Sequence, residues 1–304
     1  MVEQNILQFY QANETAENEE NETLNYIFEI GETIKNYTIE RLITQKKFVE
    51  IYLAKAKTTA QLVVIKVMRY DKIFPPKLAA EIAYFKQEFD MMRQLSHPNI
   101  CAFVDYYSDE YLTFGVMEYI EGEDTRKHLK KQENTLSQRL HLFKQMVKSV
   151  AHLHEKGLTH GDLHASNFMI SEQNEVKLID FGFTHHVEAL EHELEIEGGT
   201  MAYLPPECVN PNSFEITSQR VNFRGEVYQL GVIAYILLYE VRPFRGLTWL
   251  QLCENIKTKK PSFQPSTPKG EIIPDFILNL VQTAMNRQPD LRFANAVEIL
   301  NNWA

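Results

Sequence analysis

The segment from His160 to Gly182 concentrates polar side chains whose types suit phosphate chemistry. It reads HGDLHASNFMISEQNEVKLIDFG, with two short apolar runs around a polar turn. Antiparallel pairing of those runs as strands would bring Asn167 beside Asp180. An amide oxygen and a carboxylate together suit Mg²⁺, which usually takes only one or two protein ligands besides the phosphates of its substrate. Asp162 precedes Asn167 in the same loop, so its carboxylate can face the same point as a base for an attacking hydroxyl.

A second pair of charged residues lies upstream, on an expected strand and an expected helix. Lys66 follows the apolar run Val-Val-Ile, which is typical of a strand, and a helix is expected to begin after Pro75-Pro76. Glu88 lies on the apolar stripe of that helix, between Phe85 and Met92. An inward-facing carboxylate needs a cation, and Lys66 is the natural candidate.

The pattern of elements predicts an α+β protein with two unequal lobes. Short runs of β-branched and aromatic residues dominate the first part, interrupted by one helix, and long helical patterns follow. The expected strands are 37–43, 48–55, 62–68, 101–108 and 112–118, and the long helices are 136–156, 224–240 and 276–286. The predicted joint between a small β-rich lobe and a larger helical lobe is near 118–124, and a cleft between lobes is a usual place for a small ligand.

Composition narrows the class of partner and the compartment. The chain has 304 residues, 44% of them apolar, and a net charge of −10, which argues against nucleic-acid binding and favours a basic substrate over an anionic membrane surface. Its three cysteines follow no metal or disulfide pattern, and no apolar stretch is long enough for a membrane span. A cytoplasmic location is therefore expected.

The acidic leader, residues 1–36, differs from the rest of the chain. Its glutamates sit among Asn and Thr with few basic residues, which predicts disorder. At the end of the acidic stretch, four apolar side chains alternate as in a strand, and this piece is expected to pack on the domain or on a regulatory partner; they are Leu24, Tyr26, Phe28 and Ile30.

The segment from His160 resembles the catalytic and metal loops of eukaryotic-type (Hanks-type) serine/threonine protein kinases, which read HRDLxxxN and DFG. The resemblance implies that Asp162 accepts the proton of the substrate hydroxyl, and that Asn167 and Asp180 hold Mg²⁺ against the phosphates of ATP. It also implies that Lys66 contacts the inner phosphates and that Glu88 pairs with it.

The same resemblance implies where the nucleotide base lies. Met117 matches the gatekeeper, and the backbone at Glu118 to Ile120 matches the hinge that binds the adenine edge. Asp124 would accept hydrogen bonds from the ribose, unless it is a solvated loop acid. Apolar walls for the purine are expected from Ile43, Ile51, Val64 and Met169.

Features of the helical part are similar to those of protein kinases rather than small-molecule kinases. The run GGTMAYLPPE resembles the segment that docks a peptide substrate, with Thr200 bracing the catalytic Asp and Glu207 closing the segment. Arg292 matches the arginine that pairs with that glutamate. The resemblance covers a kinase domain at 37–304, with an N-lobe at 37–118, a hinge at 118–124 and a C-lobe at 125–304.

The phosphate-covering loop departs from the family pattern. Thr44, Lys46 and Val49 stand where the family has three glycines, and non-glycine residues cost on the order of 1 kcal/mol each in left-handed conformations. The loop is therefore expected to adopt another shape. Either Lys46 or Lys47 supplies charge in place of backbone amides, or both are solvated.

The catalytic and activation segments also depart. Gly161 replaces the arginine that holds an activation-segment phosphate in the family, and Thr184 is the sole candidate phosphosite between residues 183 and 197. Activity is therefore expected to be constitutive or partner-controlled. His164 replaces a lysine that contacts the transferred phosphate, and Glu226 replaces an Asp.

The leading hypothesis is an active Ser/Thr protein kinase that uses ATP and Mg²⁺. A pseudokinase or nucleotide-gated scaffold is the alternative that the missing glycines favour. A small-molecule phosphotransferase is a third, because HGDLH also resembles aminoglycoside kinases.

Overall fold

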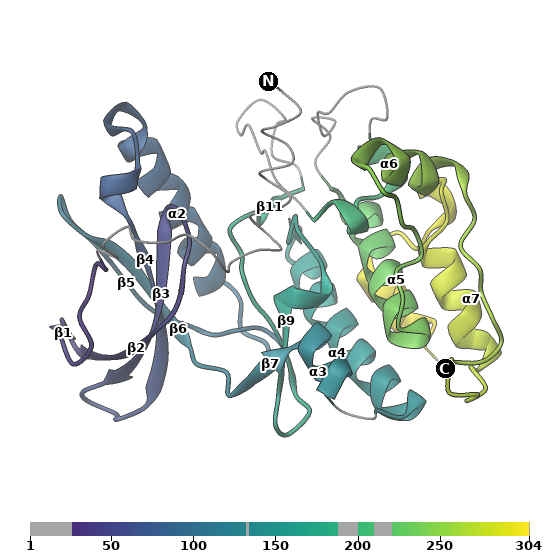
Figure 1. The fold of residues 1–304 in the computed structure, drawn as a ribbon, viewed down its shortest axis with the longest axis horizontal. Helices are drawn as coiled ribbons and strands as arrows, with labels where there is room; N and C mark the ends of the chain where they lie inside the picture. Colours follow the sequence, from purple (N-terminus) through teal and green to yellow (C-terminus); the bar gives the residue numbers. More distant parts are fainter. Residues whose placement is uncertain (1–25, 132–133, 188–199, 210–220, 304) are drawn as a thin grey trace.

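The chain forms two lobes, one built on a β-sheet and one mainly helical (Figure 1). The computed structural model describes residues 26–131, 134–187, 200–209 and 221–303. The sheet-rich lobe is formed by the first part of the chain, and the helical lobe by the rest, with β6 leading into β7 at the junction. This arrangement agrees with the two-lobed α+β fold predicted from the sequence.

The small lobe contains a six-stranded antiparallel sheet with the order β1-β2-β3-β4-β6-β5. β-Branched and aromatic residues favour these extended segments. The strands are β1 (Thr33–Ile34), β2 (Tyr37–Gln45), β3 (Val49–Ala56), β4 (Leu62–Met68), β5 (Phe103–Ser108) and β6 (Thr113–Glu118).

One long helix, α2 (Leu78–Arg93), lies beside this sheet (Figure 1). The 3-10 turn Pro75–Lys77 leads into it, because proline suits the first turn of a helix. Its buried side chains include Phe85, Glu88, Phe89 and Met92, which repeat at helical spacing. The packing is close, since a Cβ at Gly115 of β6 would lie 2.0 Å from the Phe89 ring.

The large lobe is organised around α4 and α5. Its helices are α3 (Thr125–Lys131), α4 (Leu136–Glu155), α5 (Phe223–Tyr239), α6 (Trp249–Thr258), α7 (Asp275–Ala284) and α8 (Ala296–Asn301). Its short strands are β7 (Gly122–Asp124), β8 (Leu158–Thr159), β9 (Phe168–Ser171), β10 (Val176–Leu178) and β11 (His185–His186). Across the described ranges, every helix is too short or too polar to traverse a bilayer.

Two hydrophobic clusters divide the interior. One lies on one face of the six-stranded sheet and includes Tyr52, Ile65 and Phe114. The other runs from the buried stripe of α2 through the helical lobe, and includes Phe89 and Phe181. Because α2 belongs to the second cluster, its packing depends on both lobes.

The prediction of a strand around residues 24–30 is wrong for the part that the structure describes. Residues 26–31 form bends and a turn, and Leu24 lies outside the described residues. Of the apolar side chains in this piece, Phe28 is buried against Tyr52, whereas Tyr26 and Ile30 are exposed. The backbone of this piece is held partly by a side chain, because Ile27 N donates to the carboxylate of Glu50 at 2.9 Å, and it reaches β2 only at Gly31, whose N donates to Ile39 O at 2.8 Å.

The described end of the leader therefore packs on the sheet. Phe28 and Tyr37 both belong to the sheet cluster, and β1 pairs with the start of β2. Disorder was expected for the leader at residues 1–36, and this is wrong for residues 26–36, which contain β1 and the buried Phe28. Residues 1–25 lie outside the described residues.

Candidate active site

Lys66, Glu88 and Asp180 meet where the two lobes join. The Lys66 Nζ lies 2.8 and 2.7 Å from the two carboxylate oxygens of Glu88 and 3.5 Å from Asp180 Oδ1. The ion pair expected between Lys66 and Glu88 is therefore present. The additional contact joins a strand of the small lobe to the loop that follows β10 in the large lobe.

The electrostatics of this cluster favour the charged forms of Lys66 and Asp180, whereas burial outweighs the effect of Lys66 at Glu88 and raises the pKa of that carboxyl. Burial disfavours the charge on Lys66, but the carboxylates of Glu88 and Asp180 outweigh it and raise the pKa of Lys66 above its usual value. The nearby ammonium of Lys66 lowers the pKa of Asp180. The result is a negative carboxylate at Asp180 that remains partly open to solvent.

The hairpin of β9 and β10 places Asn167 next to Asp180, as the sequence predicts. Met169 lies opposite Lys177, and Ile179 N donates to the Asn167 carbonyl at 2.9 Å. The Asn167 side chain donates its Nδ2 to the Asp162 carbonyl at 2.9 Å, so its Oδ1 is the amide atom suited to a cation. Asp180 itself has a φ of +65°, a conformation that costs energy for most side chains and is often found at functional sites.

Asp162 is held by two neighbours. Its Oδ1 accepts a hydrogen bond from Thr200 N at 2.9 Å, and its Oδ2 lies 3.5 Å from His164 Nε2. Burial alone would raise the pKa of Asp162, but His164 and the Thr200 amide reverse this and lower it. The brace expected from Thr200 thus comes from its backbone amide.

His164 has a defined orientation beside Asp162. Its Nδ1 accepts a hydrogen bond from Ser166 N at 3.2 Å, which assigns the remaining ring proton to Nε2, the nitrogen that faces Asp162. His164 therefore contacts the candidate base itself. In the family, a lysine that contacts the transferred phosphate stands at this position. That resemblance did not predict the contact of His164 with Asp162.

Gly161 has a structural role that the sequence analysis missed. Its φ is +87°, and a Cβ would lie 2.4 Å from the Phe183 carbonyl oxygen. Its amide donates to Glu226 Oε1 at 2.7 Å, while Glu226 Oε2 lies 2.8 Å from His154 Nε2. This conformation could have been predicted from the sequence, because a glycine in a loop, here between His160 and Asp162, often marks a positive φ.

The residues expected to surround a purine lie on one face of the sheet and on β9. In the strand register, Ile51 is opposite Lys66 and Val64 is opposite Met117, so these four side chains share a face. Met169 is on β9, opposite Asp124 of β7. Ile43, expected as another wall, is 40% exposed near the end of β2.

The hinge residues have defined partners. Glu118 ends β6, and its carboxylate contacts Lys177 Nζ at 2.8 Å and Ala102 N at 3.0 Å. Ile120 is partly buried against the large cluster. Asp124, expected at the ribose, directs Oδ1 to Arg126 N at 3.0 Å. This oxygen therefore accepts a hydrogen bond from the backbone of the first turn of α3. Sequence spacing did not predict that hydrogen bond.

The loop between β2 and β3 takes a shape that requires no glycine. The strands pair as far as Gln45 with Glu50, and Lys46 N donates to Val49 O at 2.8 Å across the turn. None of residues 44–49, all of which the structure describes, has a positive φ. The turn therefore uses no left-handed residue at the positions where the family has glycines.

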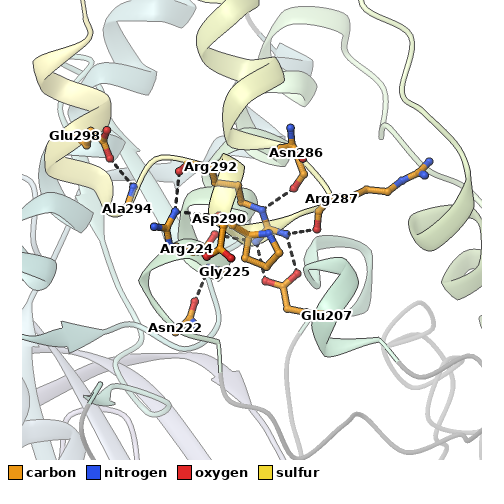
Figure 2. A network of polar contacts seen from close by, with 11 residues as sticks. Glu207, Asn222, Arg224, Gly225, Asn286, Arg287, Asp290, Arg292, Ala294 and Glu298 are labelled. Atoms are coloured by element: carbon orange, nitrogen blue, oxygen red, sulfur yellow. Dashed lines mark hydrogen bonds and ion pairs between the residues drawn. The ribbon is translucent and has the colours of Figure 1, made fainter.

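Glu207 and Arg292 form the ion pair expected in the helical lobe (Figure 2). Two parallel contacts of 2.7 Å join the guanidinium to the carboxylate. Arg292 also donates to backbone carbonyls at Asn286, Arg224 and Arg287, so its donors are well satisfied. This network fixes the end of the segment that begins at Thr200.

A cavity of about 340 Å³ lies near the loop between α2 and β5. Its lining includes Arg93, His97, Phe103 and Lys177, and contains none of the residues expected to touch nucleotide. The candidate active site is therefore defined by its converging polar groups and not by this cavity.

The residues at the hairpin fit a magnesium ion. Asn167 and Asp180 offer an amide oxygen and a carboxylate, the hard oxygen ligands that Mg²⁺ prefers. Asp180 is ionised and partly exposed, so it can accept a cation without first losing a proton.

Comparison with known proteins agrees with the fold. The family model "Protein kinase domain" matches residues 37–303. The chain is 25% identical over 272 residues to Aurora kinase C of Mus musculus, covering 89% of this chain and 92% of that protein.

Two further similar proteins carry the kinase name and are longer. The CBL-interacting serine/threonine-protein kinase 15 of Arabidopsis thaliana is 27% identical over 88% of this chain, and 60% of its own length is covered. The serine/threonine-protein kinase cds1 of Schizosaccharomyces pombe is 27% identical over 88% of this chain, with 58% of its length covered.

Proposed function

Because this chain belongs to the protein kinase family, we propose that it transfers the terminal phosphate of ATP to a serine or threonine hydroxyl of a protein substrate, with Mg²⁺ as cofactor. The observation that carries the proposal is the contact of Lys66 with both Glu88 and Asp180, because it assembles charged groups from both lobes at one point.

Asp162 is the proposed base. Its lowered pKa keeps it ionised at neutral pH, and its two neighbours fix the direction of its carboxylate. In this role Asp162 accepts the proton of the substrate hydroxyl as that oxygen attacks the terminal phosphorus, the bond from that phosphorus to the bridging oxygen breaks, and ADP leaves. His164 acts as a positioning residue for Asp162.

Lys66 and Glu88 are proposed to orient the inner phosphates. Glu88 holds the ammonium of Lys66 in one place, which reduces the entropy lost when phosphate binds. Asn167 and Asp180 would hold the metal. When bound, the metal would neutralise negative charge on the phosphates.

The adenine is proposed to lie against the sheet face defined above. Val64 and Met117 oppose each other there, with Ile51 on the same face, and Met169 would close the other side. The hinge backbone at Glu118 to Ile120 would bind the adenine edge. Ile43 and Asp124 stay as predicted contacts to the base and ribose.

A nucleotide-gated scaffold is the second candidate. The observation that favours it is the loop between β2 and β3, which lacks the glycines and has no positive φ at residues 44–49. Backbone amides in such a loop are less free to approach phosphate.

The proposed partners are a protein substrate, preferably basic given the net charge of −10, and a regulatory protein that binds the N-terminal segment. The sequence composition supports a cytoplasmic location. No nucleic-acid or membrane partner is proposed.

One assay tests the proposed enzyme. Radiolabelled ATP with Mg²⁺ is given to wild-type protein and to Asp162→Ala, with a generic basic protein as acceptor. Wild type is expected to label Ser or Thr, and the variant is expected to be about 10²–10⁴-fold slower, the usual contribution of a general base. Equal labelling by both would refute the role of Asp162. ATP-induced thermal stabilisation without transfer would support the scaffold.

A further inference from the structure

The turn between β2 and β3 contains two adjacent lysines with different surroundings. Lys46 and Lys47 are both exposed, and Lys47 Nζ lies 4.9 Å from the centre of the neighbouring Phe48 ring. Lys47 therefore has a local aromatic contact of the cation–π kind. The surroundings of Lys46 are different, and they follow from the strand register.

The register assigns a face to each residue before the turn. Thr44 is opposite Ile51, and Gln45 is opposite Glu50. Gln45 Nε2 donates to Glu50 at 2.9 Å, on the side of the sheet where Glu50 is fully buried. Since side chains alternate along a strand, Thr44 lies on the opposite side, shared with Ile51 and Lys66.

The backbone of the turn extends that placement to Lys46. The register of β2 and β3 brings Lys46 opposite Val49, and Lys46 N donates to Val49 O at 2.8 Å across the turn. Val49 lies two residues before Ile51 in β3, so Lys46 is on the face of the sheet that carries Ile51 and Lys66.

Lys46 has no ion pair of its own among the residues that the structure describes. The contacts of Asp180 and Glu88 within salt-bridge distance are to Lys66. Lys46 is thus an exposed cation on a turn that lacks the conformations with which glycine brings backbone amides to phosphate.

We propose that Lys46 binds the phosphates of the nucleotide, so that a side-chain charge replaces the backbone amides of a glycine-rich loop. The inference rests on the proposed nucleotide site and adds a contact to it. A lysine suits this position because its ammonium, on a long flexible stem, can reach phosphate from a turn that need not come close. Lys47, one residue away, is the matched control.

The experiment measures the dissociation constants of ATP with Mg²⁺ and of adenosine for wild type, Lys46→Ala and Lys47→Ala. A hydrogen bond to a charged group contributes enough that its loss is expected to weaken ATP binding about 10-fold or more in Lys46→Ala. Adenosine binding should be unchanged, because adenosine has no phosphate. Lys47→Ala should bind both ligands as wild type does, and Lys46→Arg should retain most of the ATP affinity.

The outcomes separate this inference from the proposed function. If wild type and Lys46→Ala bind ATP equally well, or if Lys47→Ala loses as much, the role of Lys46 is refuted and the nucleotide site stands. An equal loss of adenosine binding would also refute it, because the effect would then not concern phosphate. If wild type binds neither ligand, both proposals fail.

Discussion

Gly161 has a conformation that restricts which residue can precede Asp162. At a φ of +87°, a side chain costs on the order of 1 kcal/mol, and here its Cβ would also lie 2.4 Å from a backbone oxygen of Phe183. A backbone oxygen cannot rotate away as a flexible side chain can. The arginine found at this position in the family is therefore incompatible with this loop, and its absence follows from the shape of the segment.

The same substitution is expected to have different costs at two glycines. Gly157 has a similar φ of +73°, but a Cβ there would meet nothing within 4 Å. Gly157→Ala is expected to lower the free energy of unfolding by about 1 kcal/mol, from backbone strain alone. Gly161→Ala is expected to lower it by about 2–3 kcal/mol, because the clash adds to the strain. Urea denaturation of both variants provides the comparison, and equal losses would contradict the steric account.

Residue types and spacing predicted which charged side chains would pair, but they did not predict every contact that a single acidic side chain makes. The spacing of Glu88 on an apolar stripe was sufficient to expect Lys66 as its partner, because a buried carboxylate needs a cation. Asp124 was expected to contact a ribose, yet one of its carboxylate oxygens accepts a hydrogen bond from the backbone of the first turn of α3. Where a helix begins relative to an acidic residue depends on local backbone geometry that spacing alone does not specify.

At the scale of elements, periodicity predicted β4 at its observed bounds, and α4 and α5 to within a residue. These elements have strong apolar patterns and clear capping or turn residues at their ends. The alternation before residue 31 was misleading, because only Phe28 of that piece is buried and the backbone of Ile27 donates to the side chain of Glu50. A period of two is weak evidence when the run has no partner strand.

Phe28 tests whether the end of the leader is part of the folded unit. It is 4% exposed and packs on the Tyr52 ring, while Ile30 is 74% exposed. Phe28→Ala is expected to lower the free energy of unfolding by about 3 kcal/mol through lost burial and a cavity. Ile30→Ala, the matched control, should change it by less than about 0.5 kcal/mol. Denaturant unfolding measures both, and a neutral Phe28→Ala would mean that this segment adds nothing to the stability of the sheet.

At the scale of the whole molecule, the two lobes are joined by hydrophobic packing and by an ionic contact. The hydrophobic cluster of the large lobe includes the buried stripe of α2, and Lys66 contacts Asp180 across the junction. The position of α2 is thus coupled to Lys66 and Asp180 without any added modification. The organisation in two lobes could be predicted from the change in element pattern along the sequence, whereas this coupling is visible only in the three-dimensional structure.

This coupling leads to a prediction about activation. Thr184, the sole Ser, Thr or Tyr between residues 183 and 197, is 4% exposed, and its hydroxyl donates to the His160 carbonyl at 3.5 Å. A modifying enzyme would have to unfold this segment to reach it, and Gly161 offers no cation for the phosphate. Phosphatase treatment of the purified protein is therefore expected to leave its transfer rate unchanged relative to a mock-treated sample. Mass spectrometry of the segment before and after treatment shows whether Thr184 carried a phosphate.

A phosphate at Thr184 whose removal slows transfer would contradict this prediction. It would show that the segment opens and is regulated by modification. The constitutive assembly inferred from Lys66, Glu88 and Asp180 would then be incomplete.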